Sequence, residues 1–556
     1  AYDFIVVGGG SAGAVVASRL SEIENWNVLL LEAGSDETEI SDIPLLAGYL
    51  QLSQLDWQYK TEPDGQSCLA MSNGRCNWPR GKVIGGSSVL NYMLYLRGNK
   101  KDYDIWESQG NRGWSFKDVL YYFKKSEDNQ NPYLTKTPYH ATGGYLTVQE
   151  APWHTPLATA FIQAGQEMGY ENRDINGEQQ TGFMIAQGTI RRGSRCSTAK
   201  AFLRPARLRK NLHIAMQSHV TKILIDPKSK RAYGVEFVRD QKMFRIRAKK
   251  EVIVSGGSIN SPQLLMLSGI GPREHLSKHG IPVIQDDLPV GKNLHNHVSI
   301  GVQFSIKDTA YEAMTMNSVN EYLETRTGPM TSTGLTQVTA FFESSYAVTG
   351  IPDIQVFFDG FAPRCPRTGL EFECLNGALG LCPERRQINV RPTALTAASK
   401  GYLKLRSSDP LAPPLIYPNY FVDTKDLKVL VEGIKKSIQL VDTQALKQWD
   451  FRLDTVVHPM CTDYHFGSDA YWECYVRAAT GPENHQSGTC KMGAYDDPTA
   501  VVDPELRVRG VSNLRVADAS VFPLVPNGNP VAAILMVAEK AADMITHAWS
   551  KIRRYL

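Results

Sequence analysis

Three glycines near the start of the chain, Gly8, Gly10 and Gly13, have the spacing of a loop that binds a dinucleotide. A short apolar run rich in β-branched residues precedes them and a helical pattern follows, which indicates a strand, a tight turn and a helix. The first glycine permits the turn, the second lets the backbone approach a pyrophosphate, and the third lets the helix pack on the strand. The phosphates would then meet the positive N-terminus of that helix.

Glu32 ends the next apolar run, 19 residues after Gly13. A carboxylate at this place accepts hydrogen bonds from a ribose diol and repels a 2′-phosphate, so the pattern favours an adenosine without that phosphate. An ordinary turn between strand and helix is the competing interpretation, and it does not need an acidic residue at this spacing. The motif alone does not choose between NAD and FAD.

His485, in the segment GPENHQSGTCKMG, could serve as a base. When an alcohol loses a hydride its hydroxyl proton must also leave, and a histidine that titrates near neutrality suits that role. The chain has twelve histidines, however, and any one of them is more often structural. Position alone therefore does not assign the role to His485.

Three further groups could face a cofactor. Residues 80–91 form a second glycine-rich stretch whose hydroxyls and N–H groups could face an anion or a ring edge, although an ordinary turn explains it about equally well. Asp518 ends an apolar run, where its carboxylate could bind hydroxyl groups or cap the next turn. Asn529 precedes Pro530, which suits the first turn of a helix that we predict to continue through Met544.

The composition excludes several classes of protein. The 556 residues carry a formal net charge of +3 with dispersed Lys and Arg, which argues against nucleic-acid binding. No apolar run approaches the roughly 18 residues of a membrane span, so we predict none. No Cys or His spacing matches a metal site, and we predict no metal.

The nine cysteines are too few for a disulfide scaffold. Cys68 with Cys76 and Cys461 with Cys474 are the two pairs that we suspect, because each pair lies in an irregular stretch, although spacing proves neither. The segment from Cys365 to Cys382 is expected to be a long loop. No Asn-x-Ser/Thr sequon is present, which weakens a secretory interpretation without excluding it.

Periodicity places the remaining elements. Residues 211–220 are predicted to form one strand, and residues 251–271 a strand, a turn of small residues and a helix. Further helices are expected at 117–127, 156–169 and 426–441. Alternating strands are expected at 338–344, 353–361, 387–395 and 400–407.

Together these segments resemble the glucose-methanol-choline family of FAD oxidoreductases. The resemblance rests on the first glycine motif, on RGKVIGGSS followed by Asn91, on the pattern GSxxSPxLLxxSGIG at 257–271, and on the His-x-x-Gly-Thr at 485–489. It covers nearly the whole chain, and it is closest to the insect branch of the family. It implies an α/β fold: a Rossmann-like FAD-binding domain and an α+β substrate domain built on a mixed antiparallel sheet.

The resemblance also implies how the chain divides. Residues 1–108, 190–300 and 480–556 would form the FAD-binding domain, and residues 63–100 would lie over the flavin. The substrate-binding domain would comprise residues 109–189 and 301–479.

Contacts to FAD follow from the same resemblance. It implies that Asp518 binds the ribityl hydroxyls, that the backbone of Val220 meets the adenine, and that the helix after Pro530 stabilises the reduced ring. The FAD-binding residues that we predict are Gly8, Gly10, Ser11, Gly13, Glu32, Ala33, Arg80, Gly85, Ser87, Asn91, Leu94, Val220, Asp518, Ala519, Asn529, Pro530 and Val531.

His485 falls at the position of the family's general base. The partner position holds Asn529, which can donate to a substrate oxygen but cannot take up a proton, so His485 would be the only base. Asn529 could also cap the last helix. Members that attach FAD covalently have a histidine one residue before the asparagine of the second loop; this chain has Leu90, so we predict non-covalent FAD.

The resemblance implies oxidation of glucose or a related small alcohol, with a quinone or O₂ as electron acceptor. A non-sugar primary alcohol, or a lyase reaction on the same scaffold, are the alternatives. Phe357, Phe358 and Phe361 are candidates for the pocket wall, but a place in the core of a sheet is at least as plausible. We expect a secreted monomer or homodimer whose signal peptide is not in this chain.

Overall fold

The computed structural model describes residues 1–307, 316–333, 336–359 and 385–552. A seven-stranded sheet forms the first layer, in the order β11-β2-β1-β14-β13-β12, with β24 also paired to β14. The pairs among β11, β2, β1, β14 and β24 are parallel, and those of β14 with β13 and β13 with β12 are antiparallel. The strands are β1 (Tyr2–Val7), β2 (Val28–Leu31), β11 (Leu212–Ala215), β12 (His219–Ile225), β13 (Ala232–Arg239), β14 (Lys242–Val254) and β24 (Leu514–Val516).

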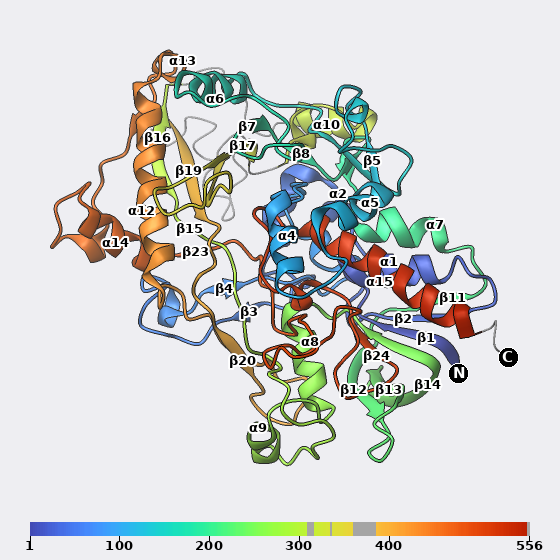
Figure 1. Ribbon diagram of the computed structural model, residues 1–556. Coiled ribbons are helices and arrows are strands. Elements are labelled where there is room, and N and C mark those ends of the chain that lie inside the picture. Colours follow the sequence, from blue (N-terminus) through green and yellow to red (C-terminus); the bar gives the residue numbers. More distant parts are fainter. Residues whose placement is uncertain (308–315, 334–335, 360–384, 553–556) are drawn as a thin grey trace.

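The two ends of the chain pack together on this sheet. Helix α1 (Ser11–Leu20) lies beside the last helix, α15 (Val531–Ile552), as Figure 1 shows in blue and red. Arg19 Nε on α1 donates to Glu539 Oε2 on α15 at 2.8 Å, and the Glu539 side chain is fully buried. Residues separated by more than 500 positions are thus held in one core.

The predicted strand over residues 211–220 is wrong in one respect, because it is two strands. The chain breaks between β11 and β12 at Gln217, whose φ is +53°. The break lets the N–H groups of Gln217 and Ser218 donate to the carbonyls of Gly34 and Glu32, at 2.9 and 2.8 Å. Long-range bonds to the end of β2 therefore override the local preference for one strand.

A second, eight-stranded sheet has the order β22-β16-β19-β18-β17-β7, with β15 paired to β19 and β23. All of the strand pairs recorded for its described residues are antiparallel. Helices α6 (Pro156–Glu167) and α12 (Thr424–Ile438) pack against it, α12 along β19 (Figure 1). Its strands are β7 (Gly182–Ile185), β15 (Val298–Ser299), β16 (Val302–Ile306), β17 (Thr336–Phe342), β18 (Ile354–Asp359), β19 (Arg386–Ala394), β22 (Arg452–Leu453) and β23 (Gly481–Pro482).

The predicted fold class is confirmed: a Rossmann-like α/β unit with a largely parallel sheet stands beside an antiparallel sheet covered by helices. The predicted helices are also confirmed, as α5 (Phe116–Ser126), α6, α12 and α15, with shifted ends. The strand expected at 400–407 forms, but as β20 (Tyr402–Lys404) it pairs with β21 (Leu415–Tyr417) in a separate two-stranded sheet. The loop expected at Cys365–Cys382 lies outside the described residues.

The remaining helices and strands lie outside the two large sheets. The helices are α2 (Glu39–Asp42), α3 (Ala47–Leu50), α4 (Lys100–Ser108), α7 (Arg204–Ala206), α8 (Gly257–Leu267), α9 (Arg273–Lys278), α10 (Met316–Thr325), α13 (Gln444–Lys447) and α14 (Asp469–Ala478). The strands are β3 (Tyr59–Lys60), β4 (Asn77–Trp78), β5 (Glu127–Asn129), β6 (Leu146–Glu150), β8 (Gln187–Gly188), β9 (Ile190–Arg191) and β10 (Ser194–Arg195).

Two large apolar cores correspond to the two sheets. The first also contains Trp114, Phe123 and Leu146, which come from the segment 109–189 that we assigned to the substrate domain. The exact division of the chain into domains stays a prediction.

Both suspected disulfides are confirmed. Cys68 is bonded to Cys76 and Cys461 to Cys474, with Cα–Cα distances of 5.6 and 5.9 Å. Among the described residues, none of the helices combines the length and the apolar character that a membrane span requires. The same residues hold no cluster of three or more His, Cys, Asp or Glu side chains that could bind a metal.

Candidate functional site

The first glycine motif forms a tight turn from β1 into α1. Gly8 has a φ of +96°, in the left-handed region that favours glycine. A Cβ on Gly13 would lie 1.8 Å from the Gly8 carbonyl oxygen, so only glycine lets α1 pack this closely. Gly10 differs, because its added Cβ would come no nearer than 3.7 Å to a protein atom. The protein itself does not require a glycine there, and Gly10 lines a cavity.

The second glycine-rich stretch packs directly on the first. Gly85 N donates to the Gly9 carbonyl at 2.7 Å, and a Cβ on Gly86 would lie 2.6 Å from the Gly10 Cα. The two loops that the sequence singled out therefore form one wall. This contact favours a binding role for residues 80–91 over an isolated turn.

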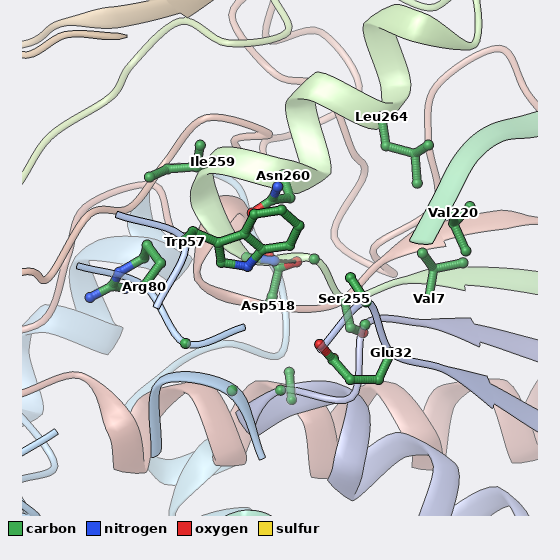
Figure 2. Close-up of a pocket in the computed structure, with 18 of the residues that line it drawn as sticks. Val7, Glu32, Trp57, Arg80, Val220, Ser255, Ile259, Asn260, Leu264 and Asp518 are labelled. Carbon is green, nitrogen blue, oxygen red and sulfur yellow. Dashed lines mark hydrogen bonds between the residues drawn. The ribbon is translucent and has the colours of Figure 1, made fainter. Parts of the chain in front are cut away.

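Glu32 lies at the end of β2, where backbone N–H groups hold both of its oxygens. Gly9 N donates to Oε2 and Gly34 N to Oε1, each at 2.7 Å. Burial raises the pKa of Glu32 to about 7, although these bonds oppose the rise. Figure 2 shows Glu32 and Val220 on one side of the cavity and Arg80 on the other.

This first cavity, together with the open space at its mouth, measures about 1090 Å³. Sequence reasoning missed several of its side chains, including Trp57, His219 and Asn260; Asn260 falls at an unspecified position of the pattern at 257–271, and the other two lie in no motif that we used. The predicted site residues that line it are Gly8, Gly10, Ser11, Glu32, Ala33, Arg80, Ser87, Val220, Asp518 and Ala519.

Asp518 fills the capping role, and its binding of cofactor hydroxyl groups stays a prediction. Its Oδ1 accepts from Ser520 N at 2.8 Å and so caps the short helix at Ala519–Val521. Its Oδ2 accepts from Gly257 N at 2.8 Å and Ser261 Oγ at 2.6 Å. The capping role is observed, and the residue also borders the first cavity.

A second cavity, of about 1250 Å³, adjoins the first. Ser11, Arg80, Ser87 and Ile534 line both, so the two cavities meet at the glycine loops. The predicted site residues on the second are Ser11, Arg80, Ser87, Asn91, Leu94, His485, Asn529, Pro530 and Val531. Gly13 and Gly85 line neither cavity, and they shape the loops instead.

Two helix N-termini point into this double cavity. No side chain caps the N-terminus of α1, which begins at Ser11. Ile534 N makes the first regular bond of α15, to Pro530 O at 2.9 Å, so the N–H groups of Val531 to Ala533 precede it. Uncapped N–H groups attract anions. These ends, the open face of Gly10 and the elongated cavity suit a dinucleotide, and the residues present fit FAD.

His485 lies between two polar partners and is almost fully buried. Its Nδ1 is 2.9 Å from His297 Nδ1, and its Nε2 is 3.3 Å from Asn529 Nδ2. Burial, reinforced by electrostatic interactions with His297, Arg80 and Arg391, lowers the pKa of His485 well below its ordinary value. The imidazole is therefore neutral and ready to accept a proton at neutral pH.

A chain of hydrogen bonds fixes which nitrogen of His485 accepts that proton. Thr339 Oγ1 donates its only hydrogen to a backbone carbonyl of β18, at 3.2 Å. Toward Gln355 Nε2, which is 3.1 Å away, the same oxygen can therefore only accept. The same Gln355 amide donates to Asn529 Oδ1 at 3.2 Å, which turns Asn529 Nδ2 toward His485. Because an amide nitrogen only donates, His485 Nε2 is the unprotonated acceptor and Nδ1 holds the ring proton.

Strand alternation resolves the open question about the phenylalanines. Gln355, Phe357 and Asp359 share one face of β18, and Phe357 lines the second cavity. Phe358 points to the other face, into the core of the second sheet. Phe361 lies outside the described residues. Phe357 therefore lies on the cavity wall, and Phe358 lies in the core of the sheet.

Sequence reasoning also missed a charged group on the cavity wall. Arg391 on β19 donates through Nε to Asp359 Oδ2 at 2.9 Å and through Nη1 to Glu483. All three residues line the second cavity. The alternation along β18 could have placed Asp359 on the face of Phe357, but the pairing with β19 is not readable from the sequence.

A dinucleotide cavity that opens onto a buried, neutral histidine is the arrangement of a dinucleotide-dependent oxidoreductase. Comparison with known proteins makes the assignment specific: the chain belongs to the GMC oxidoreductase family, because two models described as GMC oxidoreductase match residues 2–299 and 397–538. It is therefore an FAD-dependent oxidoreductase, and the resemblance seen in the sequence is confirmed.

Two relatives of known name align with the whole length of this chain. It is 51% identical to "Glucose dehydrogenase [FAD, quinone]" of Drosophila pseudoobscura pseudoobscura and 49% identical to that of Drosophila melanogaster, over 100% of this chain and 88% of each relative. Among solved structures, a formate oxidase variant of Aspergillus oryzae superimposes with a TM-score of 0.85 at 28% identity, covering 99% of both chains.

Proposed function

We propose that this protein oxidises glucose, with a quinone as the electron acceptor. The full-length similarity to two glucose dehydrogenases supports the substrate and the acceptor. The observation that carries the chemistry is the placement of neutral His485 beside Asn529 on a cavity continuous with the dinucleotide cavity. Alcohol oxidation needs such a base next to the redox cofactor.

In this proposal His485 Nε2 takes up the hydroxyl proton of the substrate. The Nδ1–H remains donated to His297, which holds the ring in the tautomer whose Nε2 is free of a proton. Asn529 keeps its amide N–H beside that nitrogen, where it can also donate to the substrate oxygen. FAD, when bound, supplies the group that accepts the hydride from the carbinol carbon.

The N-terminus of α15 adds an electrostatic contribution. Its N–H groups border the second cavity at Pro530 and Val531. A helix N-terminus stabilises nearby negative charge by about 0.3–2 kcal/mol, depending on burial. It would therefore favour the charge that a reduced cofactor ring gains.

FAD is held non-covalently in this proposal. Leu90, at the position where a histidine would form the bond, is buried among Leu50, Leu55, Val83 and Val89. A leucine side chain has no nucleophilic atom. We expect acid precipitation of the purified protein to release the yellow cofactor into the supernatant, as measured by absorbance. Flavin that stays with the pellet would contradict this.

The pH profile reports the state of the base. Because His485 is the base and burial lowers its pKa, the unprotonated form persists below pH 6.5. We expect kcat/KM for glucose to be flat between about pH 8 and pH 6.5 and to fall only at lower pH. Stopped-flow reduction of the cofactor at each pH provides the measurement. A midpoint at or above pH 6.5 would show an ordinary, solvated histidine.

A panel of alcohols tests the substrate and the acceptor together. Glucose, other sugars, and aliphatic, aromatic and terpenoid alcohols would each be assayed with oxygen and with a quinone dye. Anaerobic bleaching of the flavin by glucose supports the proposal. Preference for a non-sugar alcohol, or turnover without bleaching as in a lyase, would overturn it.

We also propose that the protein is secreted and works as a monomer or homodimer. Disulfides such as Cys68–Cys76 and Cys461–Cys474 form in oxidising compartments, which supports this location. Fractionation of the producing cells and sedimentation of the purified protein test the two parts.

A further inference from the structure

The wall of the second cavity carries three charged side chains whose arrangement the proton transfer does not explain. Arg391 lies opposite Phe357 in the register of β18 and β19, and its guanidinium carbon is 4.7 Å from the centre of the Phe357 ring. It holds the carboxylates of Asp359 and Glu483 at the same time. Arg80 also lines this cavity, so its two carboxylates are balanced by two arginines.

One atom of this cluster is left without a partner. Asp359 is 5% exposed, and Arg391 binds its Oδ2 at 2.9 Å. Its Oδ1 is buried and has no hydrogen-bond partner among the residues that the structure describes. A carboxyl oxygen buried without a hydrogen-bond partner is unfavourable. The Asp359 side chain lines the substrate cavity and keeps 7% exposure there, so a small rotation of its carboxylate brings an oxygen to a ligand that can supply the missing donor.

The surroundings decide what kind of donor fits. An apolar alcohol would expel water and leave Oδ1 unpaired, which disfavours its binding. An anionic substrate would place a second acceptor against the Asp359 carboxylate, which needs a donor. A quaternary ammonium is best bound by open aromatic faces, but here Arg391 covers the face of Phe357 and adds a positive charge. A neutral hydroxyl group meets none of these obstacles.

We propose that Asp359, held in place by Arg391, accepts a hydrogen bond from a substrate hydroxyl group other than the one that is oxidised. This deepens the proposed function and rests on it: the site selects polyhydroxylated alcohols because the second hydroxyl satisfies a carboxylate that simpler alcohols leave unpaired. Asp359 is then a residue that determines specificity and takes no part in the proton transfer.

The first experiment needs no variant. The rate constant kcat/KM of the FAD-loaded enzyme is measured for glucose and for its 2-, 3-, 4- and 6-deoxy analogues with a quinone dye. Removing a hydroxyl that binds a charged group lowers affinity by about 10- to 150-fold. We expect at least one analogue to show such a loss. If glucose is a good substrate and every analogue equals it, the inference fails while the proposed function survives.

The second experiment assigns that loss to Asp359. In Asp359→Asn, the amide oxygen must face the Arg391 N–H, so the amide N–H₂ faces the cavity and the acceptor is lost. The critical deoxy sugar is the analogue whose kcat/KM falls below that of glucose in the wild type. In the variant, the ratio of the two kcat/KM values should shrink toward onefold, which is the result that a double-mutant cycle of side chain and hydroxyl group expects for a direct contact. A penalty of the same size in variant and wild type overturns the inference. Asp359→Glu, which displaces the oxygen by one methylene, carries the same test should Asp359→Asn not fold.

Asp353→Asn is the matched control. Asp353 is equally buried and lies just before β18, but it binds Ser344 and lines neither cavity. It should leave the deoxy-sugar penalties at their wild-type size. Choline and a simple primary alcohol complete the panel. If wild type prefers either one to glucose, the proposed function itself fails, an outcome distinct from a failure of the cycle.

Discussion

Replacing His485 by alanine should lower kcat for the preferred alcohol by about 10²- to 10⁴-fold while the protein keeps its FAD. The variant removes Nε2, the unprotonated nitrogen that the bonds from Gln355 through Asn529 hold ready. No other neutral base is recorded on the second cavity among the described residues, because its other titratable side chains are paired carboxylates, arginines and a tyrosine. Steady-state turnover and the flavin absorbance per chain give the two measurements.

His458→Ala is the control for this substitution. His458 caps the short helix at Pro459–Cys461 and lines neither cavity, so its loss should leave turnover unchanged. A rate near that of the wild type for His485→Ala would remove His485 from the mechanism. A colourless His485→Ala protein would instead show that the histidine supports cofactor binding.

The first glycine loop and much of the fold could be predicted because their requirements are local. The turn at Gly8, the packing at Gly13 and the acidic Glu32 each follow from a few neighbouring residues, and the structure brings them to one cavity. The break at Gln217 could not be predicted in the same way. It depends on bonds to Gly34 and Glu32, which are distant in sequence.

The substrate wall shows the same limit more sharply. Asp359, Arg391 and Glu483 come from three separate segments, and only the register of the antiparallel sheet brings them together. A shift of that register by one residue would turn Asp359 into the core. The contacts among these three side chains therefore cannot be predicted from the sequence. The face of β18 that Asp359 occupies can be, because side chains alternate along a strand.

Gly10 and Gly13 allow binding of the cofactor to be separated from folding. We expect Gly13→Ala to yield no folded, yellow protein, because the new Cβ would lie 1.8 Å from the Gly8 carbonyl oxygen. We expect Gly10→Ala to fold, since its φ of −75° and ψ of −163° suit alanine and its Cβ meets ordinary contacts. Its methyl group enters the first cavity, however, where overpacking by about 1–3 kcal/mol weakens FAD binding by roughly 5- to 150-fold.

Thermal unfolding with and without added FAD distinguishes the two variants. The apo form of Gly10→Ala should unfold near the temperature of the wild-type apo protein, and only the stabilisation by FAD should shrink, because a ligand stabilises the native state in proportion to the logarithm of its concentration over Kd. An unchanged Kd for Gly10→Ala would mean that no phosphate approaches this backbone. The two cavities would then not form one site for a dinucleotide, and His485 would have no redox cofactor beside it.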